Sequence, residues 1–196
     1  MSAVVLAGGR ATRMDGADKG LVAFRGRPLA ARICAALRPQ VAEVMINANR
    51  NRERYRQFGH RVIADRLTGH QGPLAGMHAA LLAAEHPWLL TIPCDGPFVA
   101  ADYAARMRAA AAAAAVPLAV AHDGARAQPV YSLIHRDLAD SLERFLRSGG
   151  RKIDLWHGQH AFATVDFSAD QDLFTNINTP QQLAGLEAAG RPGAAR

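Results

Sequence analysis

Four short apolar runs alternate with helical segments through the first half of the chain, and this alternation constrains the fold more than any other feature. The runs span residues 3–7, 41–46, 60–64 and 88–92. The segments between them are about ten residues long and repeat their apolar residues at helical spacing. Repeated strand–helix units build a parallel sheet with helices on both faces. We therefore expect an α/β fold.

The second half of the chain is less regular. Asp123-Gly124 is a turn signal between two strand-like stretches. Thr179, Pro180 and Gln182 form a capping box with proline at the first helical position, so a last helix should begin there. We expect one domain, residues 1–189, and a flexible tail, residues 190–196. The other expected elements are helices 100–115, 136–147 and 151–157 and strands 117–121, 129–134 and 161–167.

Polar or glycine residues follow each of the four predicted strands. Gly8-Gly9, Asn47, Asp65 and Asp95 all lie just beyond an apolar run. In open parallel sheets, ligands bind beyond the carboxyl ends of the strands. The sequence therefore predicts one active site at that edge of the sheet.

The glycine pair after the first strand is followed by spaced cations, among them Arg13 and Lys19. Glycine lets the backbone come close to a ligand, successive N–H groups make an anion site, and Arg and Lys add charge-assisted hydrogen bonds. The spacing is neither that of a P-loop nor that of the dinucleotide fingerprint. A phosphate site is one interpretation, and a tight turn after a strand is the other.

The net charge of the chain is +6 and its pI is 10.1, which indicates an anionic partner. Nucleotides, phosphorylated cofactors and nucleic acids all fit that description. The arginines are scattered along the chain and aromatic residues make up only 6% of it, so no basic and aromatic stripe exists. We therefore expect a small polyanion and no nucleic acid.

Cysteine usage bears on the compartment. Cys34 and Cys94 lie far apart, which favours a reducing compartment over a disulfide scaffold. The N-terminus lacks the pattern of a signal peptide, and no stretch is apolar enough to span a membrane. These features predict a cytoplasmic protein without a membrane partner.

Several short motifs occur in an order that is specific when they are taken together. They resemble those of the sugar-nucleotide and cofactor nucleotidyltransferases, and most closely those of the bacterial molybdenum cofactor guanylyltransferases, over residues 3 to about 186. The motifs are Leu6-Ala7-Gly8-Gly9, Arg13-Met14, Asp18-Lys19-Gly20, Asn47-Ala48-Asn49-Arg50, Asp65, the run GPLAGM at 72–77, Pro93-Cys94-Asp95-x-Pro97 and Asn176-x-Asn178-Thr179-Pro180.

The resemblance implies a Rossmann-like three-layer fold with a mostly parallel central sheet. It also implies transfer of GMP from GTP to the terminal phosphate of molybdopterin, with Mg²⁺ as cofactor and release of diphosphate. GTP and the molybdenum cofactor would be the small-molecule partners. Molybdoenzymes or their chaperones would receive the product.

The resemblance also implies roles for individual residues. Leu6, Ala7 and Gly8 would line the nucleotide, Lys19 would contact its phosphates, Asn47 and Asp65 the guanosine part, and Asp95 both nucleotide and Mg²⁺. Arg13 is expected to clamp a phosphate, and Asn176 and Asn178 are expected on the molybdopterin or metal side. Taken singly, each has a structural alternative: Asp65, Asp95, Asn47 and Asn178 as turn or capping residues, and Lys19 as a surface lysine.

Two departures from the family pattern are present. Ala127-Gln128-Pro129 stands where the family often has a charged residue and His-Pro, so pterin recognition should differ in detail. Gly96 replaces a residue that is usually larger, which should be tolerated. His157 and His160 are close in sequence but have no acidic partner near them, so we expect a structural role for both.

Three other functions compete with guanylyl transfer. The first is cytidylyl transfer to the same cofactor, against which Gly8 argues because the cytidine-specific relatives usually carry a second alanine in that loop. The second is a non-catalytic carrier of nucleotide or cofactor, which has less need of both Lys19 and Asp95. The third, RNA binding, finds no support in the scattered arginines.

Overall fold

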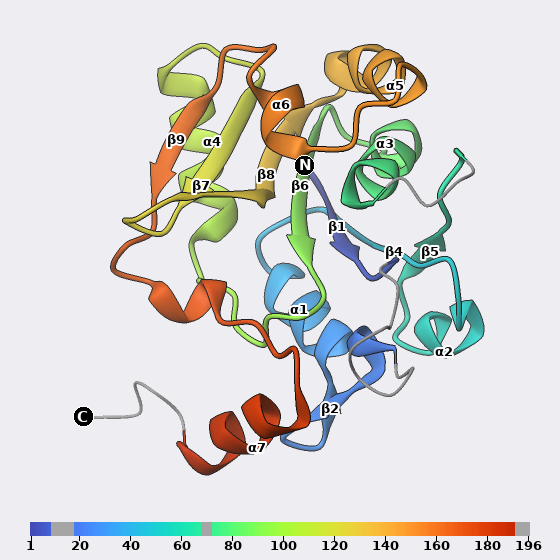
Figure 1. Ribbon diagram of the computed structural model, residues 1–196, viewed down its shortest axis with the longest axis vertical. Helices are drawn as coiled ribbons and strands as arrows, with labels where there is room; N and C mark the ends of the chain where they lie inside the picture. Colours follow the sequence, from blue (N-terminus) through green and yellow to red (C-terminus); the bar gives the residue numbers. More distant parts are fainter. Residues whose placement is uncertain (9–17, 68–71, 191–196) are drawn as a thin grey trace.

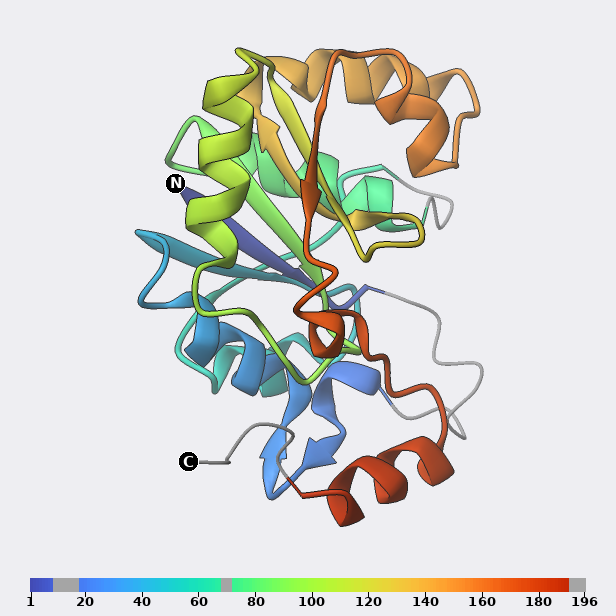
Figure 2. The ribbon, with the colours of Figure 1, turned by 90° about the vertical axis from the view of Figure 1, so that its left-hand side faces the viewer.

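The computed structural model of the chain describes residues 1–8, 18–67 and 72–190, with the side chain of residue 171 left out. These residues form a single α/β domain in which helices cover both faces of a central sheet (Figures 1 and 2). Gly9 and Arg13 of the glycine-rich loop lie outside the described residues. The predicted tail lies outside them too, apart from Gly190.

The described sheet has seven strands in the order β5-β4-β1-β6-β8-β7-β9. β5, β4, β1 and β6 run parallel to one another, and so do β7 and β9, whereas β8 is antiparallel to both β6 and β7. The mostly parallel sheet expected from the sequence is therefore confirmed. The strands are β1 Ser2–Leu6, β4 Glu43–Asn47, β5 Arg61–Ile63, β6 Trp88–Pro93, β7 Leu118–His122, β8 Ala127–His135 and β9 Ala163–Asp166.

Each face of the sheet has its own apolar core. One core packs the sheet against α1 Leu29–Leu37, α2 Arg52–Arg56 and α4 Tyr103–Ala113. The other packs it against α3 Pro73–Ala83, α5 Ala139–Arg147 and α6 Ile153–His157. Along β1 the side chains alternate between the two cores because successive strand residues point to opposite faces. Both faces are buried, so the strand reads as an unbroken apolar run.

The strand order changes direction beside β1. The chain passes from β1 through β4 to β5 on one side, and then returns to place β6 on the other side of β1. Such a switch point opens a crevice beyond the carboxyl ends of the two strands, where ligands of open α/β sheets bind. Gly8 follows β1 and Asp95 follows β6, so both lie at this crevice.

A small lobe extends beyond that edge of the sheet. It contains the hairpin of β2 Ala23–Phe24 and β3 Arg27–Pro28, and α7 Pro180–Ala188, which lie together in both ribbon views (Figures 1 and 2). Phe24 and Ile177 pack together in its apolar centre. The backbone N–H of Arg25 donates to Glu187 Oε1 at 2.9 Å, and its guanidinium donates to the carbonyl of Leu186 at 3.1 Å. These contacts tie the last helix to the hairpin.

The sequence located most of the elements but not all of their bounds. Lys19–Leu21 form a 3₁₀ helix, η1, which the apolar pattern did not indicate. α2 begins only at Arg52, because Asn51 directly before it adopts a left-handed conformation with φ 51°. The capping box that starts α7 is confirmed. Two further 3₁₀ turns, η2 Arg136–Leu138 and η3 Gln171–Phe174, were not anticipated as such.

Among the helices of residues 1–8, 18–67 and 72–190, none has the length and apolar character needed to cross a membrane.

Candidate active site

The floor of the crevice is the end of β1. The N–H of Ala7 donates to the carbonyl of Asn47 at 2.8 Å, and the N–H of Cys94 donates to the carbonyl of Leu6 at 3.1 Å. The backbone after β1 is therefore held between the ends of β4 and β6. Leu6 and Ala7 are buried and Gly8 is half-buried, so the chain reaches solvent at the glycine.

Lys19, Asp95 and Asn178 come from three distant parts of the chain and meet at the end of β6. The Lys19 ammonium lies 3.6 Å from Asp95 Oδ2 and donates a hydrogen bond to Asn178 Oδ1. The side chains of Lys19 and Asp95 are 24% and 23% exposed, so a ligand can reach both. A cation and a carboxylate side by side are suited to a phosphate chain and a divalent metal ion.

One oxygen of the Asp95 carboxylate is available as a ligand. Oδ1 is buried and has no hydrogen-bond partner among the described residues. The residue itself is fixed, because its carbonyl accepts the N–H of Ile177 at 2.8 Å. An unpaired, buried, negatively charged oxygen is costly unless a cation binds it. The donor set therefore fits a hard divalent cation that uses one protein carboxylate together with water and phosphate oxygens.

The residues around Asp95 are not nucleophiles. Burial, with the Asp95 charge next in importance, raises the pKa of the Cys94 thiol far above its usual range. Burial likewise raises the pKa of Tyr131, whose hydroxyl donates to the carbonyl of Leu173 at 3.0 Å.

A Cβ on Gly96 would lie 3.1 Å from both the Tyr131 hydroxyl and the Thr175 carbonyl. The glycine thus suits the close approach of residues 173–175.

A second polar group follows β4 and β5. Asn47 donates to Asp65 Oδ1 at 2.9 Å, and Asn49 donates to Asp65 Oδ2 at 2.8 Å. The N–H of Asp65 returns a hydrogen bond to Asn49 Oδ1 at 2.9 Å. We name these three residues the amide–carboxylate network. Its members hold one another in place and still offer further acceptor lone pairs to a ligand.

Two glycines make room for this network. A Cβ on Gly8 would lie 3.0 Å from Asn47 Oδ1 and 3.1 Å from Asn49 Nδ2. A Cβ on Gly76, in α3, would lie 2.3 Å from Asn47 Oδ1 and 2.9 Å from Leu6 Cδ2. Asn47 is 2% exposed, so it has little space to move away. A larger residue at either glycine would displace the amides.

Comparison with known proteins supports what the motifs indicated. Residues 3–161 match the family described as the MobA-like NTP transferase domain. A molybdenum cofactor guanylyltransferase of Shewanella halifaxensis is 47% identical over 189 residues, which are 96% of this chain and 94% of the relative. That of Shewanella sediminis is 46% identical and is covered to 96%.

The chain belongs to the molybdenum cofactor guanylyltransferase family.

Solved structures share the fold of this guanylyltransferase-family chain at lower identity. The molybdopterin-guanine dinucleotide biosynthesis protein A of Archaeoglobus fulgidus is 23% identical, with a TM-score of 0.79 and coverage of 96% and 98% of the two chains. A 2-C-methyl-D-erythritol 4-phosphate cytidylyltransferase of Thermus thermophilus is 21% identical, with a TM-score of 0.69 and coverage of 95% and 96%. These likenesses show that the fold is shared.

The structure groups the residues predicted for this family in two clusters. Lys19 and Asp95 meet Asn178, and Asn47 meets Asp65, whereas Asn176 is exposed. Sequence reasoning passed over three residues that complete these clusters. Asn49 and Asp18 were seen only as parts of quoted motifs, and Tyr55 was missed altogether.

Proposed function

We propose that this chain transfers GMP from GTP to the terminal phosphate of the molybdenum cofactor, forming the guanine dinucleotide and diphosphate. The observation that carries the proposal is the pairing of Lys19 with Asp95 at the β1–β6 switch point of a chain in this family. A phosphate chain needs a cation there, and a metal ion needs a carboxylate.

The reaction requires positioning and charge neutralisation but no enzyme nucleophile. The acceptor phosphate attacks the α-phosphorus of GTP, the bond to the bridging oxygen breaks, and diphosphate carries away the electron pair. Lys19 neutralises charge on the phosphate oxygens as it develops. In this proposal the glycine-loop N–H groups and Arg13 assist it, although Gly9 and Arg13 lie outside the described residues.

Asp95 is the proposed magnesium ligand, through the unpaired Oδ1 and its neighbour Oδ2. A bound Mg²⁺ supplies Lewis-acid stabilisation of phosphate oxygens and keeps several of its waters. Among the described residues, no group of three or more His, Cys, Asp or Glu side chains is arranged to hold a metal. One protein carboxylate with water and phosphate ligands is the arrangement that we propose, and it is common for Mg²⁺.

The amide–carboxylate network is the proposed guanosine side of the site. Guanosine presents N–H and hydroxyl donors, and the carboxylate of Asp65 with the amide oxygen of Asn47 presents acceptors. Leu6, Ala7 and Gly8 form the adjoining wall. Asn178, which accepts a hydrogen bond from the Lys19 ammonium, is proposed on the molybdopterin side, and Asn176 with it.

The setting proposed for this reaction is the cytoplasm, with molybdoenzymes or their chaperones as the receivers of the product. GTP and the molybdenum cofactor are the two proposed substrates.

The decisive experiment offers the purified protein the molybdenum cofactor, Mg²⁺ and GTP, CTP or ATP in turn, and measures diphosphate release. We expect turnover with GTP. Turnover with CTP alone would replace guanylyl by cytidylyl transfer. Binding of GTP without diphosphate release from any of the three nucleotides would identify a carrier.

A further inference from the structure

We propose that Tyr55 and Asn51 are positioning residues for Lys19, and that they act through Asp18. This inference rests on the role proposed above for Lys19 in guanylyl transfer. It adds residues from α2 and the turn before it, which do not themselves contact the Lys19–Asp95 pair.

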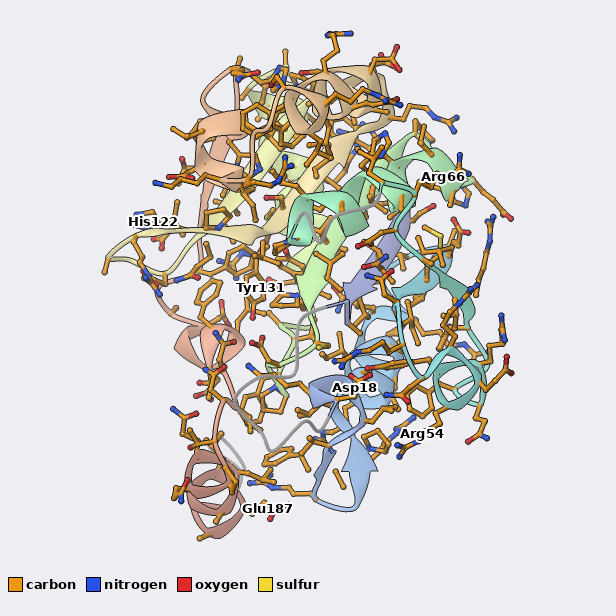
Figure 3. All side chains as sticks on the ribbon, turned by 45° about the vertical axis from the view of Figure 1, so that its right-hand side comes forward. Asp18, Arg54, Arg66, His122, Tyr131 and Glu187 are labelled. Carbon is orange, nitrogen blue, oxygen red and sulfur yellow. The ribbon has the colours of Figure 1, made fainter. Side chains whose placement is uncertain are left out.

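The two oxygens of the Asp18 carboxylate are held by different side chains. The Tyr55 hydroxyl donates to Oδ1 at 2.5 Å, and the Asn51 amide donates to Oδ2 at 3.1 Å. Figure 3 shows Asp18 beside the segment that carries Lys19, facing α2. Hydrogen bonds to a carboxylate are stronger than those between neutral groups, so this pair fixes Asp18 firmly.

Asp18, whose carboxylate is held in this way, lies at the start of the turn that carries Lys19. The carbonyl of Asp18 accepts the N–H of Leu21 at 2.9 Å, and the carbonyl of Lys19 accepts the N–H of Val22 at 3.1 Å. The backbone of Gly20 lies against the Tyr55 side chain, since a Cβ at residue 20 would come within 2.5 Å of its hydroxyl. Tyr55 thus holds both the residue before Lys19 and the residue after it.

Tyr55 is itself immobile and is linked to the other half of the pair. It is fully buried in the core beneath β4. Burial raises its pKa well above the usual range, and the nearby Cys94 thiol and Asp18 add to that shift, so the hydroxyl stays protonated and donates. Cys94 directly precedes Asp95. The Tyr55 hydroxyl therefore lies against the turn that presents Lys19 and within electrostatic range of the residue that precedes Asp95.

Asn51 reaches Asp18 only because of its backbone conformation. It has φ 51° and ψ 28°, a left-handed geometry that asparagine adopts more readily than most residues. Its side chain does not cap α2. The amide is therefore used for Asp18 rather than for the helix.

A lysine needs such positioning more than an arginine does. Its charge is compact and sits at the end of four rotatable bonds, so the direction of its stem decides where the ammonium lies. Small displacements of a catalytic group reduce rate steeply. Because Asp18 and Gly20 are held in place, the backbone of Lys19 between them is held too. This sets the direction of the Lys19 side chain toward Asp95.

The test is a double-mutant cycle between Tyr55→Phe and Lys19→Gln, with kcat and KM for GTP measured in the presence of Mg²⁺ and the molybdenum cofactor. We expect Tyr55→Phe to lower kcat about tenfold in the natural background and by less than about twofold in the Lys19→Gln background. The matched control is Tyr103→Phe, because Tyr103 is equally buried and donates to the carbonyl of Thr91 at 3.2 Å. Its effect should be the same in both backgrounds.

The outcomes separate this inference from the proposed function. Equal losses from Tyr55→Phe in both backgrounds would show a merely structural tyrosine and overturn the inference alone. Full activity of Lys19→Gln would remove Lys19 from the reaction and overturn the inference, while leaving guanylyl transfer itself in place; absence of diphosphate release from the natural protein would overturn the proposed function. Asn51→Gly provides a variant that cannot unfold the core, because Asn51 is exposed and glycine adopts its φ freely. It should lower kcat about threefold, and only when Lys19 is present.

Discussion

Asp95 and His157 each contain a buried polar atom without a hydrogen-bond partner in the described chain, yet they occupy opposite kinds of surroundings. Asp95 follows β6 at the switch point, 3.6 Å from the Lys19 ammonium. His157 ends α6, which lies with α5 at the end of the molecule away from α7 (Figures 1 and 2). Its ring packs near those of Trp156 and Phe162.

Access separates the two residues. The Asp95 side chain is 23% exposed, so a cation can reach its carboxylate from solvent. His157 is 3% exposed, and burial lowers its pKa to about 4, so it is neutral at physiological pH. A neutral nitrogen tolerates the lack of a partner better than a charged oxygen does. Unpaired buried atoms thus indicate function only where a charged ligand can arrive.

The largest effect is expected at Asp95. Asp95→Asn keeps the size of the side chain but removes the charge that holds the metal ion. We expect kcat to fall by about 10³-fold, which is the range for loss of a group that stabilises transition-state charge. Steady-state diphosphate release with GTP and the molybdenum cofactor measures it.

Thermal unfolding of the same variant in the absence of ligand is the control. The melting temperature should change little, since the variant relieves the unpaired Oδ1 but also loses the partly exposed ion pair with Lys19. Turnover within a few-fold of the natural protein would exclude Asp95 as the metal ligand. A large fall in melting temperature would show that the carboxylate is structural, as His157 is.

The next effect is a loss of stability in acid that depends on His157. Its folded pKa of about 4 lies below the usual value of 6.5. The neutral form is therefore favoured in the folded state, and its stabilisation is complete above pH 6.5 and is lost as the pH falls toward 4. The loss is about 2 kcal/mol at pH 5 and about 3 kcal/mol at pH 4.

Urea unfolding at pH 7, 6, 5 and 4 measures this loss, and His157→Phe is the comparison. The variant cannot take up a proton at this position. Its free energy of unfolding should therefore fall by about 2 kcal/mol less at pH 5, and by about 3 kcal/mol less at pH 4, than that of the natural protein. If the free energy of unfolding fell equally with pH in the two proteins, the lowered pKa assigned to His157 would be contradicted. Asp95→Asn should leave the His157 contribution unchanged, because the two residues lie far apart in the fold.

The sequence predicted the framework of the sheet because apolar runs and helical spacing are local signals. The strands 41–46 and 88–92 correspond to β4 and β6, and the capping box at Thr179 marks the start of α7. The antiparallel direction of β8 is less local. It depends on pairing with β6, which is far from β8 in sequence, as well as with the neighbouring strand β7, which the Asp123-Gly124 turn indicated.

The site was predictable where residues follow strands and not where they support others. Asn47, Asp65 and Asp95 follow apolar runs, so all three lie at the same edge of the sheet, Asn47 with Asp65 and Asp95 with Lys19. Tyr55 carries no such signal. A single tyrosine in a polar, arginine-rich segment usually packs into the core and has no role in a site. Its contact with Asp18 spans 37 residues and becomes visible only in three dimensions.

The smallest expected effect concerns the choice of base at Gly8. Unlike Asp95, the amide–carboxylate network is internally satisfied, so a change here should shift selectivity without removing the chemistry. In Gly8→Ala the new Cβ would press on Asn47 and Asn49 at about van der Waals contact or closer. We expect the ratio of kcat/KM for GTP to that for CTP to fall about tenfold, close to 1.4 kcal/mol. Competition between the two nucleotides measures the ratio.

Asn49→Ala removes one of the two amides on which the Cβ presses, so Gly8→Ala should have a smaller effect in that background. An equal shift in both backgrounds would mean that residue 8 contacts the base itself and does not act through the network.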